Sequence, residues 1–321
     1  MRVLVTGATT SLGDALVRAL LAEPTVEHVL AVAIEPGVQD APRLSYRRVD
    51  LTRERAVHDL VHGLAAELAI DAVVHAAMHR DARDEGPAIH ARNVDATRRL
   101  LHACLDVPAI GRFVFPGSAA VYAVRPGAPT LLDEDAQLEF DPRAPQWVRD
   151  RVEADLTVCA AMGMRHLALT VLRGAEILAP GTGSQLWDYL QSRVCLRPAG
   201  FDPMINLLTL DDAVAAIVGA LAAGRSGVYN IAGADTLPLS CLIRRWGRRD
   251  VPVPGPLLAP LYRLRTWTTG RKFRYDLNAR RFHLGGIVDD RRARAELGYR
   301  PSHPIRWPHD AGGFSRSGLK T

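Results

Sequence analysis

The sequence predicts an α/β fold in which a doubly wound, mostly parallel sheet carries helices on both faces and a smaller C-terminal lobe is attached. Three observations support this prediction. An apolar strand at residues 3–5 breaks at a glycine turn, from Gly7 to Gly13, and continues as a helix to Ala22. Further short apolar strands follow, separated by segments long enough for helices. With 321 residues and 48% hydrophobic residues, the chain can bury the core of one large domain and a lobe.

The remaining elements of the large sheet can be placed in order along the chain. We expect strands at residues 29–34, 46–49, 70–77 and 112–122 (the last with its loop), and a helix that contains residues 93–97. The chain should leave the sheet after Arg173 and return at 205–210 and 228–231. The prediction is therefore a large domain of residues 1–175 plus 205–232, a lobe of 176–204 plus 233–308, and a disordered tail at 309–321, which is rich in Gly and Ser.

The glycine turn carries the first functional signal. A strand, a tight turn and a helix N-terminus expose backbone N–H groups at the positive end of the helix dipole, and this arrangement binds a pyrophosphate. Thr10 stands where the middle glycine of such a turn allows the phosphates to approach closely, although its hydroxyl could donate to a phosphate oxygen. The alternative is an ordinary strand-to-helix turn whose glycines serve only the backbone geometry.

Two later segments extend the pattern. Residues 206–213, Asn-Leu-Leu-Thr-Leu-Asp-Asp-Ala, resemble the motif "FIHVDDVA", and residues 289–301 resemble "D-x-x-K-A-x-x-E-L-G-x-x-P". Together with the glycine turn and residues 112–122, they make the chain similar to the extended short-chain dehydrogenase/reductase family, of the NAD-dependent epimerase/dehydratase type that works on nucleotide sugars. The resemblance runs from about residue 2 to 305. It implies a Rossmann-type fold, an NAD cofactor, a small-molecule ligand such as a nucleotide-sugar diphosphate, and a homodimer.

The resemblance also implies which residues contact the cofactor. The acid that grips the ribose is displaced: Ala33 stands at its usual position, and Glu35 follows on the same side of an extended chain, where it could reach the ribose or face solvent. No arginine lies in the turn or at the end of this strand, which favours NAD over NADP. The full expected set is Gly7, Thr9, Thr10, Ser11, Leu12, Gly13, Glu35, Asp50, Leu51, Ala76, Ala77, Asn93 and Arg151.

The family's catalytic pair is missing. Ser118 matches the catalytic serine, but Trp147 stands in place of the tyrosine and Arg151 in place of the lysine of Tyr-x-x-x-Lys. The chain has only two lysines, Lys272 and Lys320, and neither lies four residues after a tyrosine. An indole N–H only donates and does not titrate, so Trp147 cannot shuttle a proton. Arg151 keeps the positive charge.

Two function classes stay open. The first is a dinucleotide-binding protein with a degenerate site that acts as a binding or regulatory protein, and the sequence favours this class. The second is an active epimerase, dehydratase or reductase with a rebuilt proton relay that uses Ser118, Tyr122 or a substrate group. Loss of a positioned general acid or base costs roughly 10²–10⁴ in rate.

Composition bears on cellular location, metal binding and the kinds of partner. Four well-separated cysteines without a C-x-x-C pattern indicate reduced thiols and a cytoplasmic protein. His75 and His79 have no ligand partner at metal-binding spacing, so we expect no metal. Residues 240–300 contain fifteen Arg and Lys but five Asp and Glu, which indicates a solvated basic face or a substrate-diphosphate site. We expect no nucleic-acid partner and no contact with a membrane surface, since no base-reading motif or clear amphipathic pattern accompanies the charge.

The expected dimer would use two helical segments, 88–106 and 144–162. Their apolar faces are available for such pairing, although both could equally belong to the core. The residues concerned are Leu100, Leu101 and Cys104 on the first segment, and Leu156, Cys159 and Ala160 on the second.

Overall fold

A seven-stranded sheet forms the centre of the protein. The computed structural model describes residues 1–37, 39–269 and 273–308. The strand order is β11-β7-β5-β4-β1-β2-β3, and every neighbouring pair is parallel. This confirms the predicted α/β fold. The strands are β1 (Arg2–Thr6), β2 (His28–Ala33), β3 (Leu44–Arg48), β4 (Ala72–His75), β5 (Arg112–Pro116), β7 (Ala168–Gly174) and β11 (Gly227–Ile231).

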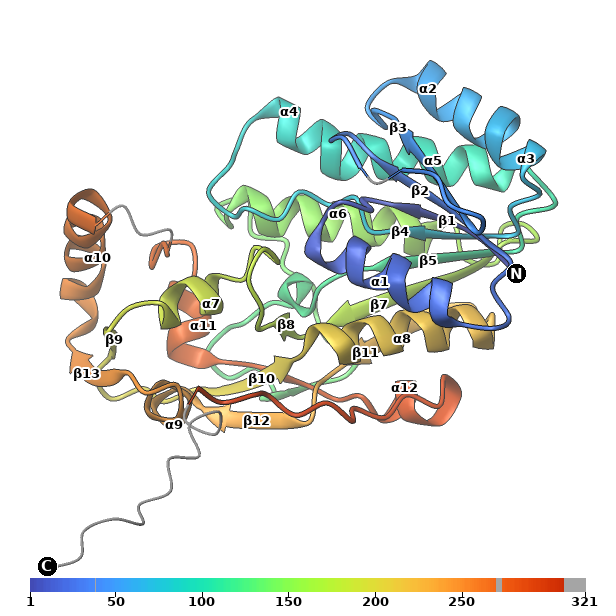
Figure 1. Cartoon of the computed structure of the whole chain (residues 1–321). Coiled ribbons are helices and arrows are strands. Elements are labelled where there is room, and N and C mark those ends of the chain that lie inside the picture. The colour runs from blue at the N-terminus through green and yellow to red at the C-terminus, as the bar shows by residue number, and fades with distance from the viewer. Residues whose placement is uncertain (38, 270–272, 309–321) are drawn as a thin grey trace, which may run out of the picture.

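Helices cover both faces of this sheet because its strands are apolar on both sides. Val3 and Val5 of β1 pack into the core beside α1 (Ser11–Ala22) and α8 (Leu210–Ala223), whereas Leu4 packs into the core beside α5 (Ala96–Leu105). Figure 1 shows α8 and α5 on opposite sides of the strands. The face of α5 also holds α2 (Glu54–His58), the π-helical η1 (Asp59–Leu64), α3 (Ala65–Glu67), α4 (Pro87–His90) and the π-helical η2 (Ala91–Asp95). The helix α6 (Gln146–Ala160) contributes to both cores.

In the described part of the chain, the remaining elements form three small sheets and six helices. The sheets are β12-β10-β8, β13-β9 and β14-β6. Their strands are β6 (Leu131–Leu132), β8 (Glu176–Ile177), β9 (Val194–Pro198), β10 (Met204–Leu208), β12 (Asp235–Pro238), β13 (Arg249–Val253) and β14 (Ile287–Val288). The helices are η3 (Ala119–Val121), α7 (Gln185–Leu190), α9 (Leu239–Arg245), α10 (Gly255–Thr269), α11 (Ala279–Leu284) and α12 (Arg291–Glu296). η3, α12, β6 and β14 pack into the core beside α1 and α8, whereas α7, α9, α10 and α11 pack into a third core. The third core is rich in aromatic residues, and Tyr189, Phe273 and Phe282 pack against one another inside it.

One expected strand lies elsewhere. Residues 205–210 were expected to return to the large sheet, but β10 pairs with β8 and β12 in the three-stranded sheet. The expectation was wrong because β11 pairs directly with β7 and takes the place beside it. The division of the chain into a domain of 1–175 plus 205–232 and a lobe of 176–204 plus 233–308 therefore stays a proposal. The tail at 309–321 lies outside the described residues.

The two faces expected to form a dimer differ in exposure. Leu100, Leu101 and Cys104 are fully buried inside the protein, so this face belongs to the core. Leu156 and Ala160 on α6 are exposed and Cys159 is half-buried. Pairing of two copies across α6 stays a proposal. Within the described ranges, no helix combines the length and the apolar character that crossing a membrane requires.

Candidate functional site

The turn between β1 and α1 is built around two glycines. Gly7 has φ +70°, and a Cβ there would lie 2.7 Å from the carbonyl oxygen of Ala76. A Cβ on Gly13 would lie 2.1 Å from the carbonyl oxygen of Gly7. Both glycines are therefore required by close backbone contacts, and the turn stays open toward the carboxyl ends of the strands.

Thr10 caps the helix that follows. Its hydroxyl accepts a hydrogen bond from the backbone N–H of Gly13 at 3.0 Å and donates one to the carbonyl oxygen of Gly7 at 2.8 Å. The hydroxyl proton is thus engaged within the turn. Donation from this hydroxyl to a phosphate would require the loss of its hydrogen bond to Gly7, so that role stays a prediction. Thr10 replaces glycine with an N-cap, which stabilises the start of α1.

A first cavity of about 590 Å³ opens beside this turn. Thr9 donates a hydrogen bond to Glu35 at 2.9 Å, so the carboxylate that was expected to reach the ribose stands next to the glycine turn. Asp50 accepts two hydrogen bonds from Thr52. Of the expected cofactor contacts, this cavity is lined by Gly7, Thr9, Thr10, Ser11, Glu35, Asp50, Leu51 and Ala77. We call it the cofactor cavity.

The other expected contacts lie elsewhere. Gly13 and Ala76 do not line the cofactor cavity. The backbone of each lies directly against the backbone of Gly7. Leu12 and Arg151 line a neighbouring cavity. Asn93 is buried away from both cavities, with only 1% of its surface exposed. It forms hydrogen bonds with other protein groups, as described below.

The neighbouring cavity has a volume of about 420 Å³, and we call it the second cavity. It shares Met78, Arg80 and the segment 183–185 with the cofactor cavity. Gly183 has φ +72°, and a Cβ there would lie 2.3 Å from the carbonyl oxygen of Arg80. The segment therefore lies directly against the loop after β4. Sequence reasoning did not identify Arg80, although its position just beyond the end of β4 is where parallel sheets place ligand-binding groups.

Ser118 lines the second cavity and also caps η3. Its oxygen accepts a hydrogen bond from the backbone N–H of Ala120 at 3.2 Å. Ser118 therefore acts as the N-cap of η3, and its hydroxyl hydrogen stays available for a ligand. Tyr122 lines the same cavity. Its phenol donates to Asn230 at 2.6 Å and accepts from Arg173 at 3.1 Å, and burial raises its pKa to about 12. Tyr122 is consequently a poor proton acceptor near neutral pH.

Trp147 and Arg151 line the second cavity together. Trp147 is 8% exposed, and its indole nitrogen is buried and has no hydrogen-bond partner among the described residues. The guanidinium of Arg151 lies 4.9 Å from the centre of the Trp147 ring, and Arg151 Nη1 donates to the Trp147 carbonyl oxygen at 2.8 Å. Burial, followed by the positive charge of Arg80, lowers the pKa of Arg151 to about 10. Arg151 nevertheless stays a cation at neutral pH.

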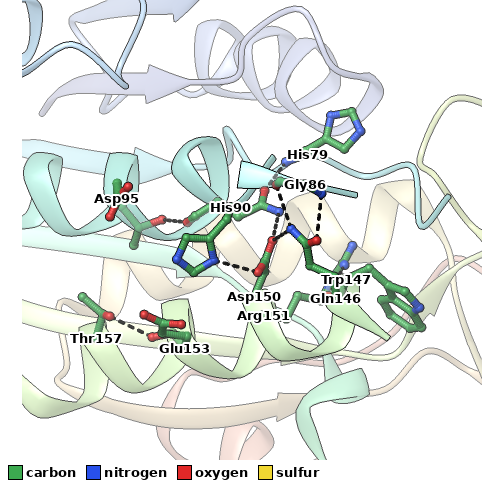
Figure 2. A network of polar contacts seen from close by, with 12 residues as sticks. His79, Gly86, His90, Asp95, Gln146, Trp147, Asp150, Arg151, Glu153 and Thr157 are labelled. Atoms are coloured by element: carbon green, nitrogen blue, oxygen red, sulfur yellow. Dashed lines mark hydrogen bonds and ion pairs between the residues drawn. The ribbon is translucent and has the colours of Figure 1, made fainter. Parts of the chain in front are cut away.

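A polar network fixes the first turns of α6, as Figure 2 shows. The buried carboxylate of Asp150 interacts with His90 Nδ1 at 2.9 Å and accepts a hydrogen bond from Asn93 Nδ2 at 3.0 Å. Gln146 binds both the N–H and the carbonyl oxygen of Gly86. Asn93 Oδ1 in turn accepts from the backbone N–H of His79 at 2.8 Å. Asn93 therefore links the loop after β4 to Asp150 of α6, and its expected contact with the cofactor stays a prediction.

Several arginines in the second half of the chain form ion pairs. Arg280 forms ion pairs with Glu139 and Asp141, Arg281 pairs with Glu176, and Arg294 pairs with Asp290. This pairing supports a structural role for much of the basic region. Arg271 and Lys272 lie outside the described residues.

The candidate metal residue His75 belongs to the core. Its two ring nitrogens contact the hydroxyls of Thr6 and Thr97, and burial lowers its pKa to about 4. In the part of the chain that the structure describes, no three His, Cys, Asp or Glu side chains form a metal-binding group.

The parallel sheet, the glycine turn and the two adjoining cavities define a dinucleotide-binding fold with a ligand cavity beside it. The chain belongs to the NAD dependent epimerase/dehydratase family, whose model matches residues 3–232. An uncharacterized protein of Mycobacterium tuberculosis strain H37Rv is 33% identical over 308 residues, covering 93% of this chain and 80% of that protein. A 3-diazoavenalumate denitrifying reductase of Streptomyces sp is 31% identical over 312 residues, covering 95% and 97%.

Solved structures show the same fold at low identity. A dTDP-glucose 4,6-dehydratase from Bacillus anthracis in complex with NAD has a TM-score of 0.68 and is 17% identical, covering 94% of this chain and 92% of its own. A UDP-glucuronic acid 4-epimerase from Bacillus cereus in complex with NAD has a TM-score of 0.68 and is 18% identical, covering 95% and 94%.

Proposed function

We propose that the protein binds NAD(H) in the cofactor cavity and acts as a reductase that does not use the family's tyrosine–lysine proton relay. The observation that carries this proposal is the second cavity, which joins the cofactor cavity at Arg80 and 183–185 but presents Trp147 and Arg151 where the relay would be. A protein that only bound the dinucleotide would not need this adjoining space.

The residues of the cofactor cavity fit NAD. Gly7 and Gly13 keep the turn free of side chains that would block a pyrophosphate. Glu35, held by Thr9, is placed to accept hydrogen bonds from ribose hydroxyls. A phosphorylated ribose would meet this carboxylate, so we propose NAD in preference to NADP.

The chain's own groups can bind and orient a substrate but cannot relay a proton at position 147. The indole N–H of Trp147 donates only, and Arg151 is a permanent cation. Ser118 can donate a hydrogen bond to a ligand. The carboxylates that line the second cavity, Glu139, Glu176 and Asp276, each form an ion pair with an arginine.

A reaction that needs a hydride alone is compatible with this site. NADH held by the glycine turn and Glu35 would supply a hydride, and a diazonium carbon that accepted it would form a C–H bond and lose dinitrogen with the C–N bonding pair, so no added proton would be needed. The name of the relative from Streptomyces sp describes a reductase that acts on a diazo compound and removes nitrogen. This relative supports the reductase over an epimerase or dehydratase that acts on nucleotide sugars, whose chemistry needs a general acid/base.

A second candidate is a binding or regulatory protein without turnover. The partly stacked Trp147 and Arg151 favour it, because they occupy the positions from which the family's catalytic pair acts. The two candidates differ in one measurable property, the transfer of hydride.

Hydride transfer can be tested with NADH deuterated at the transferred position. We expect deuterium in the product of an aryl diazonium carboxylate, above the rate without protein, and none in UDP-glucose or dTDP-glucose. Gly13→Ala is the matched blank, because its Cβ would collide with Gly7 and prevent cofactor binding. NADH binding without transfer to any acceptor would refute the reductase and leave the binding protein. Absence of NADH binding would refute both.

The variant Trp147→Tyr with Arg151→Lys tests the assignment of the site. Since tyrosine is smaller than tryptophan, we expect the variant to fold and to gain proton-dependent chemistry on nucleotide sugars. Wild-type turnover that is unchanged by both Ser118→Ala and Trp147→Phe would show that the reaction takes place elsewhere.

A further inference from the structure

Two arginines of the second cavity have no carboxylate partner. Arg80 and Arg151 both line the cavity, and neither forms an ion pair within the described part of the chain. The other arginines of its lining behave differently: Arg143 pairs with Asp141, Arg280 with Glu139 and Arg281 with Glu176. The cavity therefore contains two guanidinium groups without an ion-pair partner among the described residues, although the charges of Glu176 and Asp150 partly offset that of Arg151.

These two charges are poorly solvated. Burial lowers the pKa of Arg80 to about 10, as it does for Arg151. Arg80 Nε is buried and has no hydrogen-bond partner in the part of the chain that the structure describes, and the same holds for the indole nitrogen of Trp147. A buried cation or donor that lacks a partner is unfavourable, so an anion that accepts from these groups would stabilise the site.

The rest of the wall is apolar and partly aromatic. Met78, Phe115, Trp147 and Leu172 line the same cavity, and the guanidinium of Arg151 lies over the Trp147 ring. Apolar walls with a few charged groups favour a ligand that combines an apolar body with one acidic group. Guanidinium groups bind carboxylates strongly because several N–H groups can donate at once.

We infer that the second cavity binds an aromatic organic acid, with its carboxylate held by Arg80 and Arg151 and its apolar part packed against Trp147 and Phe115. The inference rests on the proposed function only in taking this cavity as the substrate site. It places the substrate among small organic acids and not among nucleotide sugars.

A phosphate would use the same chemistry. Arg80 also lines the cofactor cavity, so its partner could instead be a phosphate of the dinucleotide or of a nucleotide sugar. The experiment must therefore measure the affinity for the acid and the affinity for NADH separately.

Calorimetric titration of the full chain provides this separation. The probes are benzoate, cinnamate and 2-naphthoate, the neutral amide of each, and pyrophosphate and UDP-glucose, with and without saturating NADH. We expect Arg80→Gln and Arg151→Gln each to weaken binding of the carboxylates by roughly 10- to 100-fold. Arg143→Gln is the matched control, because Arg143 lines the same cavity but is paired with Asp141. It should bind the carboxylates like the wild type, and the amides should bind weakly to every form.

Several outcomes would overturn the inference. These are no binding of any of the three carboxylates, binding that both glutamine variants retain, or a preference for pyrophosphate or UDP-glucose over the acids. Loss of NADH affinity in Arg80→Gln with unchanged carboxylate affinity would assign Arg80 to the cofactor and also overturn it. If a glutamine variant folds poorly, the corresponding lysine variant, Arg80→Lys or Arg151→Lys, takes its place. Because lysine keeps the positive charge, the lysine variant should bind the carboxylates more tightly than the glutamine variant does.

The tests separate the two proposals. Arginine-dependent carboxylate binding without hydride transfer would keep this inference and refute the reductase. Hydride transfer without arginine-dependent carboxylate binding would keep the reductase and refute this inference.

Discussion

Replacing Thr10 should change protein stability and cofactor affinity in opposite directions. Its hydroxyl forms two hydrogen bonds within the turn, to Gly13 and Gly7, and Thr10→Ala loses both, at a cost of about 0.5–2 kcal/mol of unfolding free energy. Thr10→Gly should lose only a few tenths of a kcal/mol, since glycine is itself an acceptable N-cap. Without a Cβ, however, the backbone can approach a pyrophosphate more closely. One recovered hydrogen bond to a charged phosphate contributes about 1.5–3 kcal/mol, so NADH affinity should rise by about tenfold or more.

The assay pairs NADH titration, followed by fluorescence or calorimetry, with urea unfolding of the same variants. Thr10→Ser is the control because it keeps both hydrogen bonds and the Cβ, so its affinity and stability should both stay close to those of the wild type. If Thr10→Gly folds but binds NADH no more tightly than the wild type, the Cβ of Thr10 does not obstruct the phosphates. If binding weakens, the capped turn itself serves the cofactor, and the reasoning is refuted.

Two further predictions concern the groups that support the site. Arg173 donates two hydrogen bonds to the fully buried Asp155. Arg173→Met should therefore lower the free energy of unfolding, measured in urea, by about 3–5 kcal/mol, and adding Asp155→Leu should recover most of this loss. A loss below about 1 kcal/mol would contradict a buried ion pair. The hydrogen bond to Asp150 raises the pKa of His90, so its stabilisation is fully present below pH 6.5, the ordinary histidine pKa, and is lost as pH rises through the raised value. His90→Asn should remove this part of the pH dependence, and identical stability–pH curves for wild type and variant would rule it out.

The large sheet could be predicted because its signals are local. Apolar runs such as Val3 to Val5 and the glycines at 7 and 13 each specify their own conformation, and the strands of the large sheet begin and end close to the predicted residues. The place of β10 could not be predicted in this way. Its residues 205–208 are buried, and a short buried strand looks the same in sequence whether it joins a large sheet or a small one.

The candidate site was likewise predictable where its signals are local and not where they depend on the tertiary structure. Ser118, Trp147 and Arg151 were located by motif spacing, and the structure brings all three to one cavity. The hydrogen bond between Asn93 and Asp150 was not predicted because the two residues lie 57 positions apart in the chain. Arg80 was missed because its distinguishing property is a buried Nε without a hydrogen-bond partner among the described residues, and this property depends on the tertiary structure.

The segment 183–185 lies between the two cavities and can couple ligand binding in one to ligand binding in the other. It borders both of them and lies against the backbone of Arg80, so any shift of this loop alters both at once. Thermodynamic linkage then makes the effect mutual: by whatever factor the dinucleotide changes the affinity for the second ligand, that ligand changes the affinity for the dinucleotide by the same factor. The conformation of Gly183, which lines both cavities, thus enters the binding equilibrium of each ligand.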